Sequence, residues 1–174
     1  MPHDRDRRVK PGDDGRWGKE TSRRTVVHHS TSAPRFAAQD ARFSAMEVRW
    51  GLVPDMGGMA LLPELVRADV ARDLVWSGRI VAAQEALALG LITRVCADPR
   101  AEALAYARQV ATRSPDAVRA GKRLLGHAVR MSVAEILREE SVEQLALIGS
   151  PNQLEAVAAN LEKREPQFNG GPSA

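Results

Sequence analysis

The chain has 174 residues, of which 44% are apolar and 27% charged, close to the average of a globular domain. No apolar run approaches the roughly 18 residues that a membrane-spanning helix needs. The single cysteine, Cys96, excludes an intramolecular disulfide framework and favours a reducing compartment. Because the N-terminus is charged and lacks the apolar core of a secretory signal, the sequence predicts a cytoplasmic protein.

The positive charge is concentrated in the first 34 residues. They contain eight Lys and Arg and five Asp and Glu. The rest of the chain contains 17 basic and 17 acidic residues, so its net charge is zero. Apolar residues are too sparse there to offset the entropy lost on ordering, so we expect residues 1–34 to be a disordered tail. The interleaved acids and the neutral remainder argue against nucleic-acid binding. His28 and His29 lack the spaced partners of a closed metal site, so no metal is predicted.

Short elements are expected from about Arg35 onwards. In chain order they are a short extended segment over 41–48, a loop over 50–58, helices over 59–67, 69–78 and 82–89, and a strand over 91–96. Pro63 should bend or interrupt the first helix, and Asp69 should cap the second. Gly78 and Gly90 are typical residues for ending a helix.

Four longer helices are expected after residue 98, because each has a recognisable start. Pro99 opens the first, Ser–Pro pairs at 114–115 and 150–151 open the second and the last, and Ser132 with Glu135 forms a capping box for the third. Pro166 should end the last one. Two short strands are marginal as a sheet, so the sequence predicts the mostly helical end of an α/β domain, with two or three short strands and about six helices.

The chain is accordingly divided by sequence into four parts. These are the tail (1–34), a core (35–98), a helical region (99–168) and a loose C-terminus (169–174).

A few polar residues near the loop are candidates for chemistry. Glu47 stands between two apolar residues, where a carboxyl group gains a raised pKa and can act as a general acid or base, although a solvated charge on an edge strand is the simpler interpretation. Asp55 is either a second carboxylate or the cap of the helix that begins at Gly57 and Gly58. A double glycine before a helix also suits an anion or thioester site. Lys163 near a helix end is ordinarily explained by the helix dipole.

Three stretches resemble the enoyl-CoA hydratase/isomerase (crotonase) family, and they occur in the family's order. ARFSAMEVRWGLVPDMGG (41–58) resembles the extended segment with the catalytic glutamate and the G-x-x-P-x-x-G-G loop that follows it. WSGRIVAAQEALALGLITRV (76–95) resembles the stretch TGR-x-x-x-A-x-EA-x-x-x-GLV-x-x-V. EAVAANLEKREPQF (155–168) resembles the closing EG-x-x-AF-x-EKR-x-P-x-F.

This resemblance implies chemistry on acyl-CoA thioesters. In the family, two backbone NH groups stabilise a thioester enolate while carboxylates move protons at Cα and Cβ. The resemblance implies that Glu47 and Asp55 are catalytic and that Lys163 contacts the phosphate or adenine of coenzyme A, often across a subunit boundary. Coenzyme A arrives as part of the substrate, and no separate cofactor is implied. Further substrate contacts are implied at Trp50, Pro54, Gly57 and Gly58.

Only the C-terminal half of the family's β-spiral fold is resembled. The family's A-G-x-D and G-G-G-x-E stretches, which carry the oxyanion-hole donors and a second glutamate, do not occur before Phe43. We therefore expect a truncated protein with little or no activity alone, and whether its chemistry is hydration or isomerisation stays open. The alternative is a non-catalytic remnant whose C-terminal helices assemble into trimers, as in the family. The expected partners are acyl-CoA and other copies of the chain, with no nucleic acid and no membrane.

The short helices raise a separate expectation about exposure. In the family they pack on a sheet that this sequence does not contain. We therefore expect apolar side chains of residues 57–90 to be exposed, namely those of Leu61, Leu62, Leu65, Val70 and Leu74.

Overall fold

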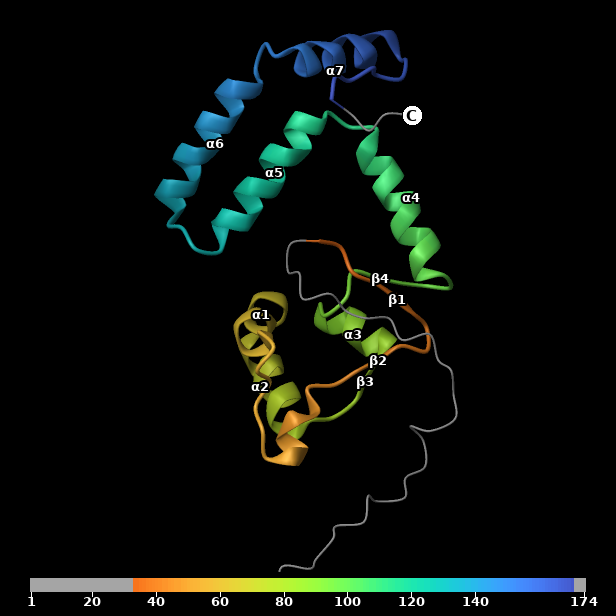
Figure 1. Cartoon of the computed structure of the whole chain (residues 1–174), viewed down its shortest axis with the longest axis vertical. Helices are drawn as coiled ribbons and strands as arrows, with labels where there is room; N and C mark the ends of the chain where they lie inside the picture. Colours follow the sequence, from red (N-terminus) through yellow and green to blue (C-terminus); the bar gives the residue numbers. More distant parts are fainter. Residues whose placement is uncertain (1–32, 171–174) are drawn as a thin grey trace, which may run out of the picture.

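The structure is a computed structural model that describes residues 33–170. Almost all of the predicted tail, and the last four residues of the predicted loose C-terminus, lie outside this range. Figure 1 shows short strands and three short helices at one end of the molecule, three longer helices at the other, and helix α4 (Pro99–Ala111) between them. The described part is mostly helical with a few short strands, which confirms the predicted fold class.

Four short strands form two separate two-stranded sheets. They are β1 (Phe36–Ala38), β2 (Arg42–Phe43), β3 (Val81–Ala82) and β4 (Arg94–Cys96). β1 runs parallel to β4 with Ala37 opposite Val95, and β2 runs antiparallel to β3 with Phe43 opposite Val81. The strand predicted over 91–96 is confirmed in its second half, because the preceding residues complete the turn after a helix.

The extended segment predicted over 41–48 is wrong beyond Phe43. The chain instead forms the 3₁₀ helix η1 (Met46–Trp50), which ends at Gly51 in the left-handed conformation with φ 70°. The Gly51 amide donates to the carbonyls of Glu47 and Val48 and so closes the turn. Because β3 has only two residues, β2 has no further ladder to join, and the chain gains hydrogen bonds by coiling.

Three short helices follow: α1 (Gly58–Leu65), α2 (Ala68–Ser77) and α3 (Ala83–Leu89). Pro63 does not interrupt α1, because the helix ends two residues later and little of it depends on the missing amide. Asp69 is not the cap of α2; it lies in the first turn and its carboxylate pairs with Arg67, 2.9 Å away. Gly78 and Gly90 end α2 and α3 in the left-handed conformation, as predicted.

Four longer helices complete the chain: α4 (Pro99–Ala111), α5 (Pro115–Ala128), α6 (Val133–Leu147) and α7 (Pro151–Glu162). The serine caps of α5 and α7 and the capping box of α6 are confirmed. The predicted end of α7 at Pro166 is wrong, because Lys163 adopts the left-handed conformation and stops the helix first. Seven α-helices therefore lie within residues 33–170, one for each helix expected from a local signal and one more than the about six expected for the fold class.

The hydrophobic core lies among the strands and short helices. Its buried members are Ala37, Leu74, Val81, Ala86 and Ile92. Phe43, Leu62 and Val70 pack against them in half-buried positions. The predicted exposure is therefore wrong: Leu74 is buried, and Leu61, Leu62, Leu65 and Val70 are half-buried. Leu62, Val70 and Leu74 pack in the core that this chain builds from its own strands and short helices. Tyr106 of α4 packs on Phe36 of β1, with ring centroids 5.8 Å apart, which ties the longer helices to the core.

Helices α5–α7 bury few side chains and expose many apolar ones. Only Ala120, Asn152 and Ala159 are buried among them. The exposed apolar residues of these helices and their C-caps, which we call the α5–α7 apolar stripes, are Val118, Leu125, Val129, Val133, Leu137, Val142, Leu145, Ile148, Leu154, Val157 and Leu161. No helix within residues 33–170 is both long enough and apolar enough to cross a bilayer.

Candidate active site

Glu47 lies in the first turn of η1 and is half-buried. Its Oε2 atom is buried and has no hydrogen-bond partner within residues 33–170. Burying a carboxylate oxygen without a partner is costly, so such an atom calls for an explanation beyond packing.

The end of α2 holds η1 in position. The Ser44 hydroxyl donates to the Gly78 carbonyl over 3.1 Å. A Cβ atom on Gly78 would lie 3.0 Å from Val48 Cγ1 and would force the two apart, and the φ of 55° at this position also favours glycine. This contact holds Glu47 in a defined place although η1 is short.

The loop after η1 leads directly into α1. Gly57 is the N-cap of α1 with φ 83°, and Gly58 is the first helical residue. Pro54 is half-buried and close to Gly58, where an added Cβ would lie 3.0 Å from the proline Cβ. Asp55 is exposed and does not cap α1, whose N-terminus has no side-chain cap, so the capping interpretation is wrong. Trp50 at the end of η1 is 76% exposed.

A cavity of ≈ 210 Å³ lies between α1 and α2. Gly58 is the only predicted site residue that lines it; the other lining residues include Leu62, Pro63, Arg72, Val75 and Trp76. Arg72 and Trp76 were not singled out from the sequence. The sequence feature that could have indicated them is their spacing, because residues four positions apart on a helix lie on the same face.

Lys163 lies away from these groups. It is the C-cap of α7, which Figure 1 places at the far end of the molecule from α1 and α2. Within the described residues, Pro54 lies beside the glycines at the start of α1, and η1, which carries Glu47, lies against the end of α2, whereas Lys163 lies at the other end of the molecule. No cluster of three or more His, Cys, Asp or Glu residues suited to a metal occurs in the described part of the chain.

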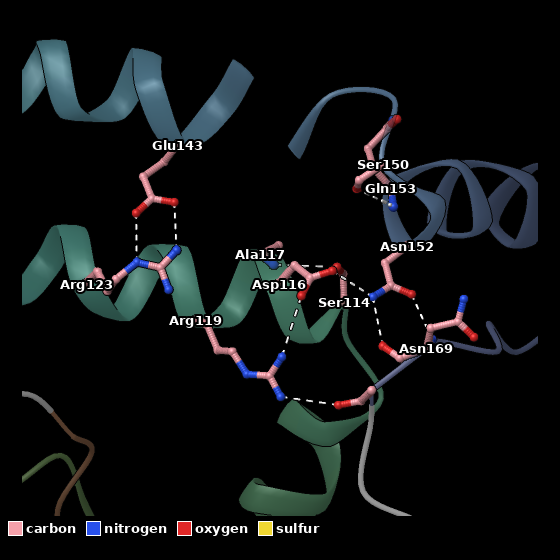
Figure 2. Close-up of polar contacts among 11 residues, drawn as sticks. Ser114, Asp116, Ala117, Arg119, Arg123, Glu143, Ser150, Asn152, Gln153 and Asn169 are labelled. Carbon is pink, nitrogen blue, oxygen red and sulfur yellow. Dashed lines mark hydrogen bonds and ion pairs between the residues drawn. The ribbon is translucent and has the colours of Figure 1, made fainter. Parts of the chain in front are cut away.

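The chain turns back after Lys163, and we call residues 164–170 the C-terminal strap. Arg164 donates to both carboxylate oxygens of Glu155, and the Gln167 amide donates to Glu155 over 2.7 Å. Figure 2 shows the next contact, where the side-chain amide of Asn152 faces Asn169. Asn152 donates to the Asn169 carbonyl and accepts from its amide, at 2.9 and 2.8 Å.

Acid is expected to weaken the strap. The hydrogen bonds from Arg164 lower the pKa of Glu155 from 4.5 to about 2. Because this pKa is lower in the folded chain than in the unfolded one, the pairing contributes full stability above about pH 4.5 and loses it as the pH falls towards 2. Glu155→Gln should therefore lower the unfolding midpoint at neutral pH, and the difference from the parent protein should shrink with acid. A constant difference across this range would contradict the prediction.

Comparison with known proteins places these features in a family. The sequence profile described as Enoyl-CoA hydratase/isomerase matches residues 29–171. A probable enoyl-CoA hydratase of Rhizobium meliloti is 34% identical over 134 residues, which cover 76% of this chain and 52% of that protein. A carnitinyl-CoA dehydratase of Salmonella arizonae is also 34% identical, over 139 residues, covering 76% of this chain and 53% of that protein. The chain thus spans about half the length of the curated relatives it matches.

Solved structures agree with the sequence matches. An enoyl-CoA hydratase from Bacillus anthracis superposes with a TM-score of 0.76 at 29% identity, covering 79% of this chain and 54% of that one. The structure of Pseudomonas aeruginosa DspI gives 0.73 at 34% identity, covering 78% and 53%. From the profile match and these relatives together, the chain belongs to the enoyl-CoA hydratase/isomerase family.

Proposed function

We propose that the chain binds acyl-CoA thioesters and that Glu47 transfers a proton next to the thioester carbonyl. The observation that carries the proposal is the buried Glu47 Oε2 atom, which has no hydrogen-bond partner in the described residues. A general acid or base must have a free oxygen at a fixed place within hydrogen-bonding reach of the substrate. The family membership supplies the substrate class, and the contact between η1 and α2 supplies the fixed place.

The loop residues have separate roles in this proposal. Asp55 is the second carboxylate, and its exposure leaves it free to reach a bound substrate. Gly57 and Gly58 let the thioester approach the start of α1, with Pro54 packed behind them. Trp50 supplies an exposed apolar surface for the acyl group. Lys163 contacts the phosphate-bearing part of coenzyme A that is bound to another copy of the chain.

We expect this chain to turn over substrate slowly when alone. Preorganised donors to the developing oxyanion are usually the largest single contribution to this type of catalysis. The residue patterns that carry those donors in the family do not occur before Phe43 in this sequence. Hydration of crotonyl-CoA at the rate normal for the family would contradict this expectation.

Proton transfer by Glu47 can be tested even at a low rate. The assay is exchange of the Cα protons of a saturated acyl-CoA with deuterated solvent, followed by mass spectrometry alongside crotonyl-CoA hydration. Glu47→Gln should lower the exchange rate about 100-fold or more while leaving acyl-CoA affinity similar. Glu64→Gln, on an exposed residue of α1, is the matched control and should exchange normally. Equal rates for the two variants would remove Glu47 from the mechanism.

A second function, assembly without catalysis, is favoured by the α5–α7 apolar stripes. Leu145 and Leu161 are 75% and 80% exposed, and exposed apolar stripes on neighbouring helices are typical of an interface. We propose that these stripes bring copies of the chain together as trimers. An interface of this kind and a catalytic role are compatible, because Lys163 lies on the same helices as the stripes.

Assembly is tested by charging the stripes. Leu145→Glu should convert the assembly to smaller species in sedimentation equilibrium, because an unpaired carboxylate would be buried in the interface. Gln144→Glu places the same charge on the neighbouring exposed position of α6 and should leave the assembly intact. A parent protein that sediments as a monomer at all concentrations would contradict the proposal.

A further inference from the structure

Lys163 holds an unusual backbone conformation. It is the one non-glycine residue with positive φ, 55°, within the part of the chain that the structure describes. Side chains other than glycine pay an energetic penalty in this region, and such residues persist only when the surroundings enforce them. The residues around Lys163 also favour helix, since Glu162 and Arg164 are both good helix formers. The left-handed turn must therefore be imposed by contacts elsewhere.

The contacts that impose it come from one face of α7. Glu155 and Asn152 are three residues apart and project on the same side of the helix. Glu155 binds the near part of the strap through Arg164 and the Gln167 amide. Asn152, which is 5% exposed, binds its far part through the backbone of Asn169. Together they draw the strap back along α7, and this course is possible only if the chain reverses at Lys163.

The far end of the strap is fixed a second time. Figure 2 shows Arg119 of α5 between Asp116 and the strap, where it donates to the Gly170 carbonyl over 3.2 Å. Asp116 in turn accepts a hydrogen bond from Asn152 over 2.7 Å. The strap is thus anchored to two helices.

The ion pairs of the strap also determine the charge available at the turn. Arg164 forms ion pairs with Glu155 and Glu162, the two carboxylates of α7 that are nearest to it in sequence. Within residues 33–170 Lys163 itself forms no ion pair, and it is exposed. Its ammonium group is therefore available for an external anion, while Arg164 satisfies the acids that would otherwise compete for it.

We propose that Glu155 and Asn152 are positioning residues that hold the C-terminal strap so that Lys163 presents its ammonium group to a phosphate of coenzyme A. This inference rests on the proposed binding of acyl-CoA. Neither residue touches the ligand; each acts by keeping the turn at Lys163 in its left-handed form. The class of ligand is a phosphate-bearing nucleotide, and the contact is a charge-assisted hydrogen bond from the lysine.

The test compares two variants that remove the same charge near Lys163. Calorimetric titration of the full chain with coenzyme A measures the affinity. Lys163→Ala should bind coenzyme A about tenfold more weakly, which would show that the lysine contacts the ligand. Glu165→Gln removes a carboxylate that lies next to the lysine in sequence and holds no part of the strap through its side chain. By charge alone, Glu155→Gln and Glu165→Gln should both bind coenzyme A as well as the parent protein or slightly better. The positioning role predicts instead that Glu155→Gln binds about five-fold more weakly.

Amide hydrogen exchange over residues 163–170 gives a readout independent of the ligand. Glu155→Gln should exchange faster there than the parent and Glu165→Gln should not, because only the first loses the two-oxygen ion pair with Arg164 and weakens the bond from the Gln167 amide. Weaker binding together with faster exchange supports the proposal. Faster exchange with unchanged affinity, or unchanged exchange, overturns the positioning role and leaves acyl-CoA binding intact. A parent protein that does not bind coenzyme A overturns the proposed function and this inference with it.

Discussion

Replacing Asn152 by aspartate is expected to lower the free energy of unfolding by about 3 kcal/mol at neutral pH. The side-chain nitrogen that donates to Asp116 over 2.7 Å would become an oxygen, so two carboxylates would face each other. The same substitution removes the hydrogen bond to the Asn169 carbonyl. Since Asn152 is almost completely buried, water cannot replace either bond without opening the junction of α5, α7 and the strap.

The pH dependence distinguishes this mechanism from a general loss of packing. Two facing carboxylates share a proton, which raises the pKa of the pair in the folded chain above that in the unfolded chain. The destabilisation should therefore be largest above the raised pKa and diminish as acid protonates one carboxylate, which can then donate to the other. Chemical unfolding of the variant at neutral and acidic pH measures this change.

The control for this experiment lies on the same helix. Asn160→Asp makes the identical chemical change at an exposed position, where the side chain bonds only the carbonyl of Ala156. It should alter stability by less than about 0.5 kcal/mol. An Asn152→Asp protein as stable as the Asn160→Asp protein would show that the buried network contributes little.

Helix starts in this chain could be predicted because their signals are local. Ser114 and Ser150 each precede a proline, and Ser132 is followed by Glu135 three residues later. In each case the cap satisfies amides within the same turn, so distant residues hardly influence it. The left-handed ends at Gly78 and Gly90 are equally local.

The surroundings of Glu47 could be predicted only in part. The loop and its glycines were evident from the sequence, but the 3₁₀ helix was not, because the alternation over 41–48 imitates a strand. Whether that alternation becomes a strand depends on β3, a partner about forty residues away that is only two residues long. Gly51, which ends η1, was the available local signal.

The C-terminal strap had no local signal at all. Asn152 pairs with Asp116 and Asn169, which are 36 and 17 residues away in the sequence. Asparagine near the start of a helix is common, so its presence there does not indicate a buried network. The early end of α7 at Lys163 depends on the same long-range contacts, which is why the local sequence predicts an end at Pro166 and not at Lys163.

The second large effect is expected in the core, where Leu74→Ala should lower the free energy of unfolding by about 3 kcal/mol. Leu74 is 3% exposed and lies in one cluster with Ala37, Val81, Ala86 and Ile92. Alanine has no side-chain rotamers, and valine and isoleucine are stiff at χ1, so these neighbours can fill little of the space left by a leucine. A core of this size has little stability in reserve, so the loss should be visible as partial unfolding at moderate temperature.

An exposed leucine provides the comparison. Leu104→Ala deletes the same atoms from α4, where the side chain is 48% exposed, and should cost less than about 1 kcal/mol. The core around Leu74 also holds α2 against η1. Leu74→Ala should therefore increase the amide hydrogen-exchange rate over residues 46–51 as well, whereas Leu104→Ala should not. Equal unfolding midpoints for the two variants would mean that the strands and short helices do not form a cooperative core, and Glu47 would then have no fixed position from which to act.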